Sequence, residues 1–93
     1  MYQLFSTKQY EKSLGRFRQG RSWNEASIRQ LLELLRIGIA LPITYQDHQL
    51  KADMELYREC HVKHNLLLLY ERNESNRSIK LIDIGTHDDI FGR

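Results

Sequence analysis

The spacing of hydrophobic and polar positions divides the 93-residue chain into strand-like and helix-like stretches. Residues 2–5 form a short apolar stretch with strand propensity. Directly behind it, Ser6 and Gln9 have the spacing of a helix capping box. Apolar residues then recur at i, i+4 and i+7, as on one face of a helix; they are Tyr10, Leu14 and Phe17. The pattern predicts a strand and then a helix that begins after Ser6 and ends near Gly20.

A second helix is predicted from the same two signals. Ser22 and Glu25 repeat the capping-box spacing, and Gly38 stands where a helix commonly stops. Between them runs a single apolar stripe at helical spacing, formed by Ile28, Leu31, Leu32 and Leu35. This is the clearest helix in the sequence.

The second half of the chain has the pattern of a sheet. Residues 43–53 are polar and irregular and predict a loop, whereas residues 55–62 alternate as a strand does. That alternation places Arg58 and Cys60 on one face and Tyr57, Glu59 and His61 on the other. The continuously apolar residues 66–70 predict a central strand covered on both faces.

A last strand is predicted over residues 79–84, after a turn at residues 71–78. Its alternation places Ile79, Leu81 and Asp83 on one face and Lys80, Ile82 and Ile84 on the other. The complete order is β-α-α-β-β-β with a terminal helical turn. We therefore predict an α+β fold, in which two N-terminal helices pack on a small antiparallel sheet.

Composition limits the chain to one domain over residues 1–93, because a chain of this length buries only about 60–65% of its unfolded surface. The single cysteine, Cys60, excludes an intramolecular disulfide. Charges interrupt the N-terminal segment where a signal peptide needs an apolar stretch, and the longest apolar run is too short for a membrane helix. We expect a cytoplasmic protein with no membrane partner.

The net charge of +2 is distributed unevenly. Residues 1–38 hold seven basic and three acidic side chains, a balance of +4, whereas residues 39–93 hold seven basic and nine acidic ones, a balance of −2. The first half is therefore the candidate surface for a polyanion or an acidic partner. Taken alone, the charge pattern fits two solvated helix faces better.

Four histidines stand at the predicted edges of elements: His48, His61, His64 and His87. Cleavage of RNA by its own 2′-hydroxyl needs a base, a cation for the crowded phosphate and an acid for the leaving oxygen. Histidine suits each role, since its ordinary pKa of about 6.5 allows both protonation states near neutrality. Arg58 is a candidate to grip the phosphate, and Tyr57 or Phe91 is a candidate to stack a base.

A metal site and a nucleotide site are less well supported. His61 and His64 with Cys60 nearby offer nitrogen and sulfur ligands, but the second ligand pair of a structural zinc site is missing. The glycines never reach the spacing of a phosphate-binding loop. We predict neither a metal nor a cofactor.

Five segments from residue 41 onward stand in a characteristic order. They are Leu41-Pro42, Tyr45-Gln46-Asp47-His48-Gln49-Leu50, Tyr57-Arg58-Glu59-Cys60-His61-Val62, Leu67-Leu68-Leu69-Tyr70 and Gly85-Thr86-His87-Asp88-Asp89-Ile90-Phe91-Gly92. No single segment is specific, but in their order and spacing this part of the chain resembles the YafQ-type toxins within the RelE/ParE superfamily of bacterial toxin–antitoxin systems.

The resemblance implies a ribosome-dependent endoribonuclease that cuts messenger RNA in the ribosomal A site and is neutralised by a cognate antitoxin. It implies that His87 is the general acid, that His48 and His61 bind or stabilise the phosphate, and that Phe91 positions the base. Glu59 matches the acidic residue that the family has two positions before its strand-end histidine. His64 is a further candidate for substrate binding.

One position departs from the family. Where members commonly carry an aspartate in the turn after the strand-end histidine, this chain has Asn65. An amide cannot accept a proton at neutral pH, so His64, His61 or Glu59 must replace it, or activity is weakened. Two alternatives therefore stay open: a RelE-fold protein that binds antitoxin or ribosome without cutting RNA, and a toxin of the gyrase-poisoning kind.

Overall fold

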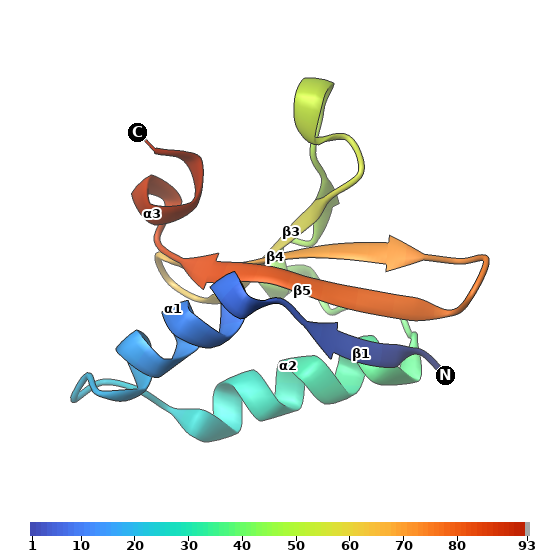
Figure 1. Cartoon of the computed structure of the whole chain (residues 1–93). Helices are drawn as coiled ribbons and strands as arrows, with labels where there is room; N and C mark the ends of the chain where they lie inside the picture. Colours follow the sequence, from blue (N-terminus) through green and yellow to red (C-terminus); the bar gives the residue numbers. More distant parts are fainter. Residues whose placement is uncertain (93) are drawn as a thin grey trace.

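The computed structural model describes residues 1–92, which form two long helices, a five-stranded sheet and a short C-terminal helix (Figure 1). The helices are α1 (Lys8–Arg18), α2 (Glu25–Ile37) and α3 (His87–Phe91). The strands are β1 (Gln3–Ser6), β2 (His48–Gln49), β3 (Arg58–Lys63), β4 (Leu66–Asn73) and β5 (Ser78–Gly85). Single 3₁₀ turns lie at Ile43–Tyr45 and Ala52–Met54. None of the helices within residues 1–92 has the length and apolarity that a membrane crossing requires.

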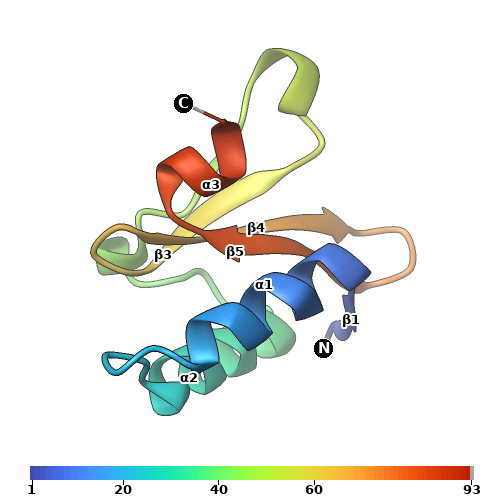
Figure 2. The ribbon, with the colours of Figure 1, turned by 60° about the vertical axis from the view of Figure 1, so that its left-hand side comes forward.

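The strand order is β1-β5-β4-β3-β2. The predicted α+β class is confirmed, but the prediction of an antiparallel sheet is wrong at one edge, because β1 pairs with β5 in parallel. A parallel pair needs a long crossover, and here the crossover is almost the whole chain. The helices α1 and α2 cover one face of the sheet, whereas α3 and the segment around residues 50–57 rise from the other (Figures 1 and 2).

Both long helices begin two positions or fewer from the predicted starts, with different caps. Thr7, not Ser6, caps α1: its hydroxyl accepts from the Tyr10 amide and lies 2.8 Å from the carbonyl oxygen of Ile82. Asn24, not Ser22, caps α2 by accepting from the Ala26 amide. In each case the chosen cap lies directly beside the helix, where its oxygen reaches the free amides of the first turn.

The predicted end of α2 at Gly38 is confirmed. Gly38 has a left-handed backbone with φ of 91°, which glycine adopts without a steric penalty. A Cβ atom here would also lie 2.7 Å from the ring of Tyr2. Both the turn and the close approach of β1 therefore require glycine.

Three predicted boundaries in the sheet are wrong. The segment 43–53, predicted as a loop, contains β2, in which His48 pairs with Glu59. The predicted strand 55–62 begins only at Arg58, because residues 52–54 form a 3₁₀ turn. The central strand continues past Tyr70 to Asn73, since the polar residues that follow still pair with β5. Strand pairing rather than apolarity sets these limits.

The core lies between the sheet and the long helices. From β4 it contains Leu66, Leu68 and Tyr70, while Leu67 and Leu69 point to the opposite face and are also buried. The prediction that this strand is covered on both faces is thus confirmed. In β5 a register shift beside Leu69 changes the alternation, so that Ile84 lies in the core with Ile79 and Leu81. The predicted face of Ile84 was therefore wrong.

Candidate active site

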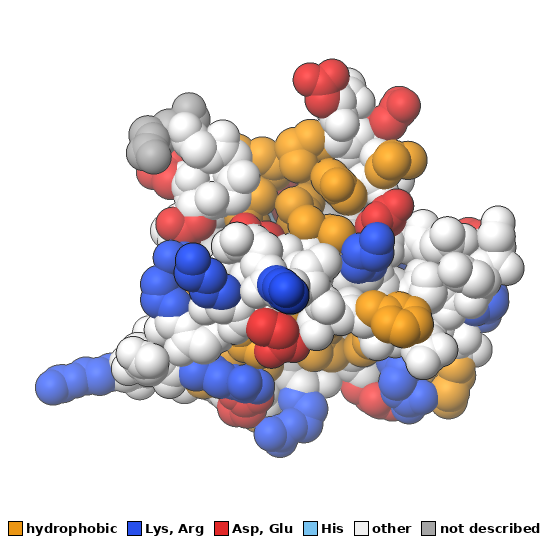
Figure 3. Space-filling model, in the orientation of Figure 1, with side chains coloured by type: hydrophobic (Ala, Val, Ile, Leu, Met, Phe, Trp, Pro, Cys, Tyr) orange, Lys and Arg blue, Asp and Glu red, His pale blue; other side chains and the backbone are white. Residues whose placement is uncertain are grey.

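One open cavity of about 220 Å³ brings together most of the predicted site residues. It is lined by Glu59, His61, His64, Asn65, Leu67 and His87. Two of them come from β3, two from the β3–β4 turn, one from β4 and one from α3. Because Glu59 and His61 alternate with the core residue Cys60, this cavity lies on the sheet face opposite α1 and α2. On that face, hydrophobic side chains are visible in the depression between α3 and the raised segment that precedes β3 (Figure 3).

Glu59 carries one bonded and one unbonded carboxylate oxygen. Its residue is 6% exposed, and Oε1 lies 3.2 Å from Nε2 of His48, its partner in the β2–β3 pair. The other oxygen, Oε2, is buried and has no hydrogen-bond partner among the described residues. Buried polar atoms are nearly always bonded, and an unbonded one requires an explanation, of which a catalytic role is one. The cavity is thus lined by a carboxylate with one oxygen that no described residue bonds.

His48 is held from both sides. Its Nδ1 lies 2.8 Å from the carbonyl oxygen of Gln46, and its Nε2 faces Glu59. Both ring nitrogens of His48 are therefore engaged, and Gln46 and Glu59 together fix the orientation of the ring. His48 does not line the cavity itself, but it contacts Glu59, which does.

The helix α3 fixes the position of His87. Thr86 caps this helix by accepting from the Asp89 amide, and the Asp89 carboxylate accepts in turn from the Thr86 amide. The latter bond lowers the pKa of the Asp89 carboxyl. Arg16 of α1 adds an ion pair to Asp89 at 3.6 Å. A Cβ atom on Gly85 would lie 2.8 Å from the Asp89 Cβ, so glycine lets this turn close.

Phe91 lies one helical turn after His87, and their ring centroids are 4.7 Å apart with an interplanar angle of 43°. The two residues that the resemblance singles out at the C-terminal end therefore lie in contact. The supporting residues Thr86 and Asp89 were not predicted, although the sequence carries their signal: a threonine followed three positions later by an aspartate is a capping box.

The β3–β4 turn presents His64 and Asn65, both exposed. Asn65 has a left-handed backbone with φ of 58°. Asparagine and aspartate enter this region more readily than other residues with a Cβ. The position is therefore compatible with the aspartate that the resemblance leads one to expect.

Arg58 is not part of the cavity. Its guanidinium donates to Asp47 Oδ2 at 2.8 Å and to Gln49 Oε1 at 3.3 Å, and the Tyr70 hydroxyl also donates to Asp47. Arg58 pairs across the sheet with Tyr70, which belongs to the core on the helix side. The prediction that Arg58 grips the phosphate does not fit this geometry. Arg58 instead anchors the segment that carries His48.

Cys60 faces the helix side as well and is completely buried. Burial in apolar surroundings raises the pKa of its thiol, which disfavours the thiolate that a metal needs. It cannot join His61 and His64, whose side chains line the opposite face. Among residues 1–92 no group of three or more histidine, cysteine, aspartate or glutamate side chains is arranged to hold a metal ion.

The role of Arg58 can be tested through stability. Asp47→Asn is expected to lower the free energy of unfolding by about 1–3 kcal/mol, because it removes the charged partner of a guanidinium whose side chain is only 25% exposed. The matched control is Glu33→Gln, which breaks the exposed Glu33–Arg36 pair on α2 and is expected to change stability by less than about 0.5 kcal/mol. Urea unfolding of both variants measures the difference. Equal losses would contradict an anchoring role.

A family model described as the bacterial toxin of the type II toxin–antitoxin system, YafQ, matches residues 2–92. The chain is 29% identical over 85 residues to the mRNA interferase toxin YafQ of Escherichia coli K12, which covers 90% of this chain and 89% of the relative. Its fold is similar to the toxin in the crystal structure of the E. coli DinJ–YafQ complex, with a TM-score of 0.86, 25% identity and coverage of 99% and 100% of the two chains. A metal-bound toxin from Helicobacter pylori gives a TM-score of 0.89 with 26% identity, covering 98% of this chain and 100% of that one.

The small α+β fold of the chain is thus that of a bacterial toxin of the type II toxin–antitoxin class. The chain belongs to the YafQ family of type II toxin–antitoxin toxins. This confirms the resemblance inferred from the segments after residue 41.

Proposed function

We propose that this chain is an mRNA endoribonuclease that acts on the ribosome, in the cytoplasm, and is neutralised by a cognate antitoxin. The observation that carries the proposal is the cavity in which three histidines face a carboxylate with one unbonded oxygen. The relatives named as mRNA interferases and the toxin crystallised with DinJ support it.

In the proposed reaction, the 2′-hydroxyl of a nucleotide loses its proton to Oε2 of Glu59 and attacks the adjacent phosphorus. The bond between phosphorus and the 5′-oxygen then breaks, and His87 gives its proton to that oxygen. The products are a 2′,3′-cyclic phosphate and a new 5′-hydroxyl end. His61 in its cationic form stabilises the negative charge that develops on the phosphate oxygens. Phe91, stacked near His87, positions a base.

His48 acts through Glu59 in this scheme. Its Nε2 lies 3.2 Å from Oε1 and orients the carboxylate while leaving Oε2 unbonded. The resemblance assigned phosphate binding to His48, but Glu59 already occupies its Nε2. We therefore propose that His48 is a positioning residue and that Glu59, rather than Asn65, is the base.

The function is tested by comparing cleavage of one message with and without ribosomes at equal RNA concentration. We expect rapid cleavage only on ribosomes, because the cavity holds few groups and correct positioning of substrate can contribute several kcal/mol to the barrier. Primer extension locates the new 5′ ends. Equal rates with and without ribosomes would contradict the A-site proposal. Translation that stalls on intact mRNA would instead support the binding-only alternative, which Asn65 favours.

A further inference from the structure

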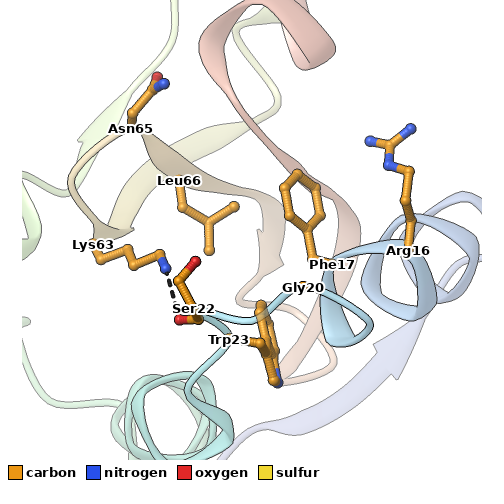
Figure 4. Close-up of a pocket in the computed structure, with 8 residues that line it drawn as sticks. All are labelled: Arg16, Phe17, Gly20, Ser22, Trp23, Lys63, Asn65 and Leu66. Atoms are coloured by element: carbon orange, nitrogen blue, oxygen red, sulfur yellow. Dashed lines mark hydrogen bonds between the residues drawn. The ribbon is translucent and has the colours of Figure 1, made fainter.

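A second cavity, of about 360 Å³, lies between the end of α1 and the β3–β4 turn (Figure 4). Its walls are the rings of Phe17 and Trp23 and the side chain of Leu66. Polar residues complete the lining: Arg16, Gly20, Ser22, Lys63 and Asn65. In Figure 4 the two aromatic rings and Leu66 surround the cavity, while the Asn65 side chain points away from them. A space of this size is at the lower end of small-ligand sites.

The aromatic wall is held in place by hydrogen bonds. Trp23 Nε1 donates to Glu25 Oε1 at 2.6 Å, and Arg18 donates to both oxygens of the same carboxylate. The bonds from Arg18 and then Trp23 lower the pKa of the Glu25 carboxyl to about 2, so it remains an acceptor at neutral pH. The indole ring therefore keeps one orientation. Across the opening, Lys63 Nζ donates to the carbonyl oxygen of Ser22 at 3.2 Å.

The two cavities lie on either side of the β3–β4 turn, and Asn65 of this turn belongs to the lining of both. An RNA strand with its reacting phosphate near His87 extends beyond a space of about 220 Å³, and this aromatic cavity is the next site along the turn. Two basic side chains at this cavity can attract a phosphate. Lys63 has no carboxylate within salt-bridge distance among the described residues, and the Arg16 side chain is 62% exposed. Arg16 shares its charge with Asp89 at 3.6 Å.

We propose that this second cavity binds the base of a nucleotide next to the cleaved phosphate. The base stacks on the ring of Trp23 or Phe17, as single-stranded nucleic acids do on aromatic side chains, and Lys63 pairs with the adjoining phosphate. Stacking depends on the flat π face of a base and not on its hydrogen-bonding groups. The site therefore aligns the strand and tolerates different bases. This inference rests on the proposed function, since it names where the substrate of that site continues.

Trp23 is the single tryptophan of the chain, so its fluorescence reports on this cavity alone. The experiment titrates the intact protein with a five-nucleotide RNA that carries 2′-O-methyl groups, which remove the attacking hydroxyl, and a fluorescein label. Label anisotropy measures binding, and tryptophan emission measures stacking. We expect quenching of Trp23 with the same Kd as the anisotropy signal. An RNA with one abasic position at the stacked nucleotide is expected to bind about 10-fold more weakly and without quenching.

Three variants complete the test. Lys63→Gln, at an exposed position, is expected to weaken RNA binding. It is also expected to make the dependence of the binding constant on salt concentration less steep, by the amount that about one phosphate contact contributes. Trp23→Phe keeps an aromatic ring and is expected to retain the affinity, whereas Trp23→Ala is expected to lose about 10-fold. Circular dichroism melts confirm that each variant is folded. Lys51→Gln, in the segment between β2 and the second 3₁₀ turn, serves as the matched charge control.

Several results would overturn the inference: no RNA binding, binding without a change in Trp23 emission, or equal quenching by the abasic RNA. Quenching by the purified cognate antitoxin and not by RNA would assign the cavity to a protein partner. Failure of the proposed function has a different signature, since the parent protein would then leave the message intact on ribosomes.

Discussion

Replacing His87 with glutamine is expected to slow cleavage of ribosome-bound mRNA by about 10²–10⁴-fold, the usual contribution of one acid–base group. Glutamine approximates the size of the imidazole and keeps hydrogen-bonding capacity, but it cannot deliver a proton to the leaving 5′-oxygen. The fold is expected to remain intact, because Thr86 and Asp89, rather than His87, make the cap of α3. Single-turnover rates on programmed ribosomes, together with circular dichroism melts, measure both properties.

The matched control for His87 is His64→Gln, an exposed histidine that lines the same cavity. We expect it to reduce cleavage by less than about 10-fold, because another group accepts the proton in the proposed reaction. A large loss of stability in His87→Gln would show that His87 is structural. Unchanged cleavage would remove it from the mechanism.

The sequence predicts the fold class and several of the residues that line the cavity, and the reason is physical. Helical stripes and strand alternation report which faces are buried, and they identified α1, α2 and the central strand β4. The sequence also placed four histidines at the edges of elements, and three of them, His61, His64 and His87, line one cavity.

The features that the sequence analysis missed also share a cause. Each of them depends on contacts between residues far apart in the chain. The strand β2 contains two residues and exists because His48 and Gln49 pair with β3, so it leaves no periodic signal. Thr7 is preferred over Ser6 as a cap because its hydroxyl also meets carbonyl oxygens of β5. The bond between Arg58 and Asp47 was not predicted, because nothing local reveals a partner eleven positions earlier.

The departure at Asn65 has a structural counterpart in Glu59. Asn65 occupies the turn where the family pattern places a carboxylate, yet Glu59 already provides one in the same cavity with an unbonded oxygen. A buried oxygen without a hydrogen-bond partner costs free energy, and a bond to substrate would recover it. Loss of the turn carboxylate is therefore compatible with activity, provided that Glu59 takes the proton.

The second large effect is expected for Glu59→Gln, which should reduce cleavage by about 10²–10⁴-fold without lowering the unfolding midpoint. Glutamine fills the same space and its amide oxygen can still accept from His48, but it has no basic oxygen for the 2′-hydroxyl proton. Stability should hold because the substitution removes a buried charge that is only half satisfied. A loss of activity at constant or higher stability is typical of a group retained for function.

Asn65→Asp separates the two candidate bases when it is combined with Glu59→Gln. The left-handed backbone at position 65 accepts aspartate, so the exchange should restore a carboxylate to the cavity with little strain. We expect the double variant to recover at least about 10-fold in rate over Glu59→Gln, whereas Asn65→Asp alone should change the parent rate only slightly, because a base is already present. His64→Ala in the parent tests the remaining candidate. Full activity in Glu59→Gln together with a large loss in His64→Ala would assign the base to His64, and Glu59 would then serve only to hold His48.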